Sequence, residues 1–152
     1  MNSDIPGCPW ETCFSTTTRL ALRLENELKK KSSLSLPEYN VLLHTERAGK
    51  NGIRLGLLAR SVVFSPSRLT HTLHRLVERG YITRTLCSQD KRGGIITLTR
   101  AGNAALRKAT SHHADLLKKL LLDDMTPEES AVFEKVFQRI RQRLDEEEFS
   151  TF

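Results

Sequence analysis

The 152-residue sequence has little cysteine and no long apolar run, and both features limit the classes of protein to which the chain can belong. Its three cysteines, Cys8, Cys13 and Cys87, are an odd and sparse set that does not indicate a disulfide framework. No apolar run approaches the roughly 20 residues of a membrane-spanning helix, and the N-terminus lacks a basic region followed by an apolar stretch. We therefore expect a single cytoplasmic protein over residues 1–152, with no membrane partner.

Catalytic motifs are also missing. The sequence contains no glycine-rich phosphate loop, no nucleophile motif and no paired acid and base at a catalytic spacing. These absences argue against an enzyme. A binding function is therefore expected.

Positive charge is present in excess and is concentrated in one region. Lys and Arg number 24 against 18 Asp and Glu, which gives a net charge of +6. Between residues 54 and 92 basic residues far outnumber the acids, which are Glu78 and Asp90, whereas residues 145–148 are all acidic. A basic region of this kind favours a polyanionic partner but does not determine the fold.

Apolar spacing predicts a mainly helical protein with a small two-stranded β-wing. Helices are expected over 10–31, from Leu36, over 55–62, over 66–79, from about Thr99 to Leu121, and after Thr126. Between the fourth and fifth helices the period becomes alternating, with strands around Ile82 and Ile96 joined by a polar, basic loop. A short helix, a turn, a second helix and a hairpin form a winged helix-turn-helix.

The helix over 66–79 has the features of a helix that reads DNA. Ser65 and Pro66 suit its start, and Gly80 suits its end. One face is apolar, and the other carries hydroxyl, histidine and arginine side chains that suit contacts to phosphates and base edges. The glycine-containing hairpin beside it is also basic, and Arg92 at its tip is placed to enter the minor groove. The candidate DNA-binding residues are Ser65, Ser67, Arg68, Thr70, His71, His74, Arg75, Arg84, Lys91 and Arg92.

Other interpretations of these residues stay open. The polar face of the helix over 66–79 is also what an ordinary solvated helix presents. Asp90 is expected to stiffen the wing by pairing with an arginine, although an acid in a turn needs no such role. His71 and His74 lie on the proposed DNA face, adjacent His112 and His113 point in different directions, and no Cys/His group has zinc-ligand spacing. We therefore expect no metal and no other cofactor.

The chain resembles the MarR family of bacterial transcription regulators from about Phe14 to Leu144. The matching segments are 58–61, 65–70, 76–84, 90–92 and 96–102, which together give a helix, glycine, strand, Asp-x-Arg wing and Leu-Thr-x-x-Gly order. The resemblance implies a homodimer bridged by helices within 10–34 and 104–148, with a DNA-binding lobe over 36–102 and a palindromic operator. It also implies that Asp90 and Arg92 match the wing motif of the family. Val63 and Arg54 depart from the family at positions where glycine and a Ser/Thr cap are common.

Dimerisation has separate support in the sequence. The terminal helices carry broad apolar stripes with large residues such as Phe133 and Phe137, although these stripes would also suit packing within one chain. The family resemblance further implies a repressor released by a small-molecule effector, whose ligand-binding residues the sequence does not identify. One alternative is thiol sensing through Cys13. The presence of Leu36 at the position where a partner tyrosine is expected argues against it. A second alternative is a winged helix that contacts proteins and does not bind specific DNA.

Overall fold

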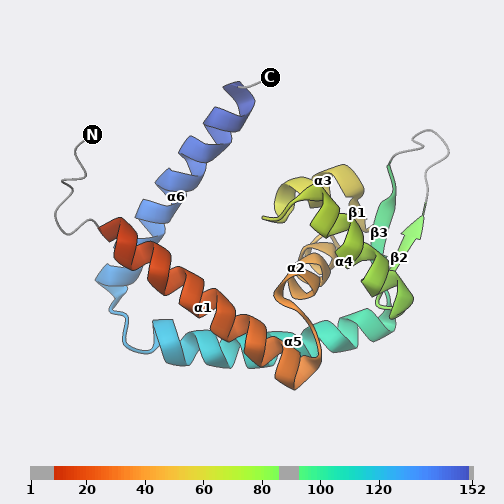
Figure 1. Cartoon of the computed structure of the whole chain (residues 1–152), viewed down its shortest axis with the longest axis horizontal. Coiled ribbons are helices and arrows are strands. Elements are labelled where there is room, and N and C mark those ends of the chain that lie inside the picture. Colours follow the sequence, from red (N-terminus) through yellow and green to blue (C-terminus); the bar gives the residue numbers. More distant parts are fainter. Residues whose placement is uncertain (1–8, 86–92, 151–152) are drawn as a thin grey trace. The chain divides into compact units, whose positions relative to one another are not determined.

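A computed structural model describes residues 9–85 and 93–150 of the chain, with side chains described up to residue 146 (Figure 1). It forms two compact units, one ending at Ala114 and one beginning at Asp115. The elements in order are α1 (Pro9–Ser32), α2 (Leu36–Arg47), β1 (Ile53–Arg54), α3 (Leu55–Ser61), α4 (Pro66–Glu78), β2 (Ile82–Thr85), β3 (Ile95–Leu98), α5 (Arg100–Leu117), a π-helical segment η1 (Lys118–Leu122) and α6 (Pro127–Ser150). The predicted mainly helical winged fold is confirmed.

The sheet has three antiparallel strands in the order β1-β3-β2, where the sequence predicted two. β1 pairs Ile53 with Ile96, and β2 pairs Ile82 with Leu98. The two-stranded prediction was therefore incomplete. A strand of two residues is too short to show the alternation on which strand prediction depends.

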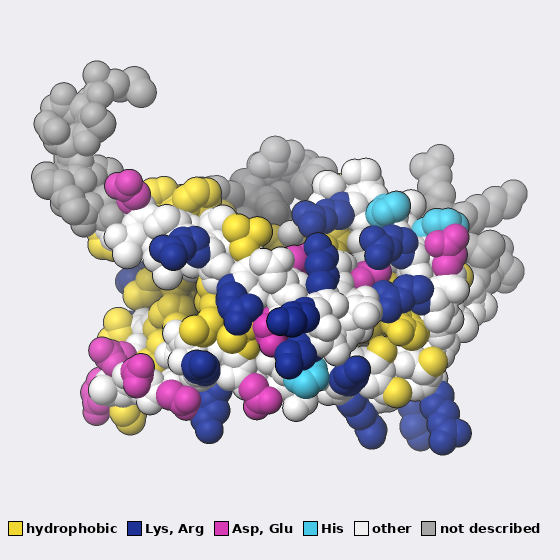
Figure 2. Space-filling model, turned by 60° about the horizontal axis from the view of Figure 1, so that its bottom comes forward, with side chains coloured by type: hydrophobic (Ala, Val, Ile, Leu, Met, Phe, Trp, Pro, Cys, Tyr) yellow, Lys and Arg dark blue, Asp and Glu magenta, His cyan; other side chains and the backbone are white. Residues whose placement is uncertain are grey.

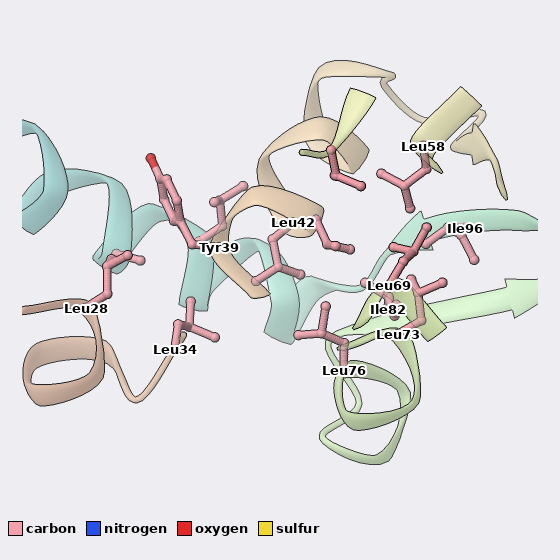
Figure 3. Close-up of a cluster of buried hydrophobic side chains, with 14 residues drawn as sticks. Leu28, Leu34, Tyr39, Leu42, Leu58, Leu69, Leu73, Leu76, Ile82 and Ile96 are labelled. Atoms are coloured by element: carbon pink, nitrogen blue, oxygen red, sulfur yellow. The ribbon is translucent and has the colours of Figure 1, made fainter. Parts of the chain in front are cut away.

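A single apolar core holds the first unit together (Figure 3). Helices α2 and α4 and strands β2 and β3 supply its centre, and the alternating pattern of the hairpin places Ile82 and Ile96 inside. Burial of such side chains contributes about 1.5–3 kcal/mol each relative to exposure. The core therefore fixes α4 from one side. Its buried members are Leu28, Leu34, Tyr39, Val41, Leu42, Leu58, Val62, Leu69, Leu73, Leu76, Ile82, Ile96, Leu106 and Ala109.

The two departures from the family pattern both have a structural explanation. Arg54 precedes α3 and makes no side-chain cap. Instead, the N–H of Leu55 donates to the carbonyl oxygen of Gly94 at 2.8 Å, so the backbone at the start of the wing satisfies this helix end. Val63, fully exposed in the turn between α3 and α4, has no positive φ, so this turn does not require glycine.

Thr99 and Gly102 join the start of α5 to the end of α4. The Thr99 hydroxyl accepts the N–H of Gly102 at 3.0 Å, as a helix cap does, and the Thr99 N–H donates to the carbonyl oxygen of Tyr81 at 3.0 Å. A side chain at Gly102 would overlap the Tyr81 carbonyl group. The Leu-Thr-x-x-Gly pattern therefore places glycine where the backbone of α5 lies in close contact with the backbone of Tyr81.

The second unit ends in the long helix α6. Thr126 and Glu129 form reciprocal hydrogen bonds at its start, at 3.2 and 2.8 Å. Its apolar stripe is exposed apart from the half-buried Val136, and the rings of Phe133 and Phe137 lie 4.6 Å apart. Among the described residues, no helix is both long and apolar enough to cross a membrane. The apolar stripe of α6 is thus exposed, whereas the apolar face of a helix is normally buried.

Candidate nucleic-acid interface

Both ends of α4 are fixed by local hydrogen bonds. At its start the Ser65 hydroxyl accepts the N–H of Arg68 at 3.4 Å, and Pro66 occupies the first helical position. At its end Gly80 has a φ of 68°, and the N–H of Tyr81 donates to the carbonyl oxygen of Leu76 at 2.9 Å. This is the glycine-ended motif that satisfies the last carbonyl groups of a helix. The predicted start and end of the recognition helix are confirmed.

The two faces of α4 differ in the way that groove binding requires. Leu69, Leu73 and Leu76 are buried in the core, together with Thr72. With 3.6 residues per turn, Ser67, His71 and His74 lie opposite them. Arg68, Arg75 and Arg79 follow one flank of the helix. The structure exposes all seven candidates from this region, which are Ser65, Ser67, Arg68, Thr70, His71, His74 and Arg75.

The exposed candidates differ in whether their side chains are already engaged. Thr70 donates its hydroxyl to the carbonyl oxygen of Pro66 at 3.0 Å, and the Ser65 and Ser67 hydroxyls lie 3.2 Å apart. His74 Nε2 lies 3.3 Å from a Glu78 carboxylate oxygen. Within the described part of the chain, the side chains of Arg68 and His71 form no hydrogen bond or ion pair. These two side chains are therefore available to a ligand without loss of an existing contact.

Glu38 on α2 meets the arginine flank of α4, and this contact was missed by sequence reasoning. The residue is 1% exposed. Oε2 accepts the N–H of Ser35 at 2.8 Å and a guanidinium hydrogen of Arg79 at 3.4 Å. Oε1 lies 3.3 Å from Arg75 Nε, close enough for an ion pair although not aligned as a hydrogen bond. The only local sign of this role is the Ser-x-x-Glu capping pattern at the start of α2.

The Arg79 side chain makes its contacts within the protein. Its guanidinium donates to the carbonyl oxygen of Ser33 at 2.9 Å and to the Tyr81 hydroxyl at 3.3 Å. It also lies over the Tyr81 ring, 4.6 Å from the centroid. Arg79 therefore ties the α1–α2 turn to the end of α4.

A polar cavity of about 440 Å³ lies between this flank of α4 and the α1–α2 junction. Its wall includes basic side chains from Lys29, Arg68 and Arg75 and acidic ones from Glu25 and Glu38. His71 and Thr72 also line it. The sequence identified no ligand-binding residue, and this cavity is formed by residues far apart in the chain.

The wing is described only at its base. Arg84 is exposed on β2 opposite Ile96, beside Gly94. Asp90, Lys91 and Arg92 lie outside the described residues, so their predicted roles stay predictions. Figure 2 shows many exposed Lys and Arg side chains, with His side chains and also some Asp and Glu side chains among them. Exposed cations of this kind suit contacts with a polyanion.

The other residues singled out by sequence form no site in the described part of the chain. The Cys13 thiol is free and half-buried on α1. No group of three or more His, Cys, Asp or Glu among the described residues has a metal-binding arrangement. Burial lowers the pKa of His113, whose ring stacks on Tyr39 at 4.7 Å. Burial, and then the charge of Arg47, lowers the pKa of His44.

Comparison with known proteins shows that the chain is similar to transcriptional regulators. Residues 23–108 match the model of a family described as transcriptional regulator SarA/Rot. The HTH-type transcriptional regulator PecS of Dickeya dadantii is 26% identical over 135 residues, which cover 86% of this chain and 81% of PecS.

Two solved structures from Streptomyces coelicolor are similar to the chain throughout. Sco3205, a MarR family transcriptional regulator solved in complex with DNA, is 26% identical with a TM-score of 0.83, over 89% of this chain and 84% of Sco3205. AbsC, another MarR family regulator, is 26% identical with a TM-score of 0.85, over 95% and 97% of the two chains. The fold and the relatives are those of regulators and not of enzymes.

Proposed function

Because the chain belongs to the SarA/Rot family of transcriptional regulators and has the winged-helix fold of the MarR type, we propose that it is a homodimeric repressor of transcription. Its partner is duplex DNA carrying a palindromic operator, and its compartment is the cytoplasm. The observation that carries this proposal is the exposed face of α4, where the side chains of Arg68 and His71 have no hydrogen bond or ion pair with any described residue and lie near the fixed start of the helix. In helix-turn-helix proteins the N-terminal residues of this helix contact the base edges.

Dimerisation is supported by the apolar stripes on the terminal helices. On α6, Phe133, Ile140 and Leu144 are exposed, and on α1 so are Trp10 and Phe14. Large apolar patches on a soluble protein mark contact sites for partners. A two-fold dimer formed through these helices would place two recognition helices about 34 Å apart, one turn of DNA.

Release by a small-molecule effector is supported by the polar cavity beside α4. Arg68 and Arg75 line it and also belong to the predicted DNA-binding set. An anionic ligand held there would neutralise arginines that otherwise face phosphate. Effector and operator would therefore compete through shared side chains, which is the coupling that release requires.

Selection from random duplex DNA, followed by sequencing, tests this function. At two salt concentrations, the chain should enrich an inverted repeat whose half-sites lie about one helical turn apart. The Arg92→Ala variant should bind this repeat more weakly and remain a dimer. Binding that is unselective and abolished by modest salt would leave only electrostatic attraction. A protein-contact function would then replace the proposed one.

A further inference from the structure

We propose that Glu38 is a positioning residue of the DNA-binding surface, whose buried carboxylate holds Arg75 of α4 in the orientation that meets DNA. This inference rests on the proposed binding of duplex DNA through α4. Glu38 lies on α2, behind the recognition helix. It does not contact DNA itself and affects binding only through Arg75.

The burial of Glu38 requires that its charge be compensated. A buried carboxylate is tolerated only when it is paired and hydrogen-bonded. Arg79 and Arg75 stand one helical turn apart on α4, and each lies beside one oxygen of the carboxylate, at 3.4 and 3.3 Å. The N–H of Ser35 is the third partner, at 2.8 Å. The carboxylate thus has a fixed site with two cations.

The two arginines are not equivalent. The Arg79 side chain is 27% exposed and is further held by Ser33 and Tyr81, so its role is within the fold. The Arg75 side chain is 51% exposed, and Glu38 contacts it at Nε. In the described part of the chain, the terminal nitrogens of Arg75 donate no hydrogen bond. Arg75 can therefore present the end of its guanidinium to a phosphate or a guanine while it keeps its ion pair with Glu38.

The first turn of α2, which carries Glu38, is held in place from α1. The Glu25 carboxylate on α1 accepts the N–H of Leu36 at 2.6 Å, and Lys29 lies 2.8 Å from the same side chain. These contacts fix the first turn of α2, where Glu38 closes the capping box with Ser35. Holding a long side chain in its bound rotamer reduces the entropy that binding would otherwise cost. Loss of the support should therefore weaken DNA binding by roughly three- to tenfold.

A double-mutant cycle on the full chain separates this role from a purely structural one. The variants are Glu38→Gln, Arg75→Ala and the double variant, and the probe is the inverted repeat obtained by selection, labelled for fluorescence anisotropy. Glu38→Gln should raise Kd by about three- to tenfold in the unchanged chain and should have no further effect once Arg75 is alanine. Ser35→Ala is the matched control. It removes the hydroxyl half of the capping box but keeps the backbone N–H that bonds the Glu38 carboxylate, so it should lower the thermal unfolding midpoint and raise Kd by less than Glu38→Gln does.

Arg75→Lys provides a test that leaves the buried carboxylate intact, in case Glu38→Gln fails to fold. Lysine keeps the positive charge but lacks the planar guanidinium that can face Glu38 and a phosphate or guanine at once, so it should also weaken binding, and Glu38→Gln should add little to it. An equal effect of Glu38→Gln in both backgrounds would overturn the proposal. So would tighter binding by Glu38→Gln, since the carboxylate would then only mask the arginine charge, or unchanged binding by Arg75→Lys. Failure of the unchanged chain to bind any duplex selectively would overturn the proposed function, and with it this role.

Discussion

The Thr99 hydroxyl at the start of α5 donates a hydrogen bond to the carbonyl oxygen of Gly80, at 2.7 Å, and so ties α5 to the end of the recognition helix. Gly102, one turn further along α5, packs against the backbone of Tyr81. The position of α4 therefore depends on a close backbone contact as well as on the apolar core.

Gly102→Ala should destabilise the first unit, because the added methyl group would overlap the Tyr81 carbonyl group. We expect a loss of about 1–3 kcal/mol in the free energy of unfolding, as for other overpacked sites, measured by urea denaturation. Gly56→Ala is the matched control. A methyl group there has no neighbour within 4 Å, and alanine in helix α3 should stabilise by about 0.5–1 kcal/mol. Equal effects of the two substitutions would contradict the proposed contact.

Arg68→Ala should change the sequence preference of the protein. An arginine that bridges a guanine contributes about 1–3 kcal/mol of discrimination, and its loss relaxes one position of the site. The measurement is competition binding against operators substituted one base pair at a time. A uniform loss of affinity across all of them would instead make Arg68 a phosphate contact.

Phe137→Glu should dissociate the proposed dimer. A carboxylate placed in an apolar interface costs several kcal/mol when it is buried unpaired, so the dimer Kd should rise by at least about 100-fold. Analytical ultracentrifugation over a concentration series measures this change. Gln142→Glu introduces the same charge on the opposite side of α6 and should leave the dimer intact. Dissociation by both variants, or by neither, would mean that the stripe is not the dimer contact.

Stability should fall in mild acid, in part through His113. Burial lowers the pKa of this histidine, so the unfolded chain takes up its proton first as the pH drops. Its contribution is fully present above the ordinary value of about 6.5 and is lost as the pH falls through the lowered value. Chemical denaturation at several pH values should show a weaker pH dependence for His113→Gln than for the unchanged chain. A slope unaffected by His113→Gln would rule this residue out.

The ends of the recognition helix could be predicted from sequence because their chemistry is local. Ser65 and Pro66 suit a helix start wherever they occur, and Gly80 suits the positive φ that ends this helix. The alternation around Ile82 and Ile96 gave the hairpin for the same reason, since each strand needs only its own residues to show a buried side.

Features formed between distant residues could not be predicted. Strand β1 has only Ile53 and Arg54, and its pairing with β3 decides that it is a strand. Glu38 can be recognised as a capping residue from its neighbours, but its ion pairs with Arg75 and Arg79 depend on how α2 packs against α4. Arg75 was predicted to contact DNA and was not expected to have a partner within the protein.

The position of the core along the chain has a consequence for biosynthesis. Every buried residue of the core cluster precedes residue 110, and α6 begins at Pro127. Translation proceeds at about 5–20 residues per second, so about 1–4 s pass between the addition of the last core residue and the start of α6. Small helical domains fold well within that time. The first unit can therefore complete its core before α6 is made in full, so that folding precedes any assembly through that helix.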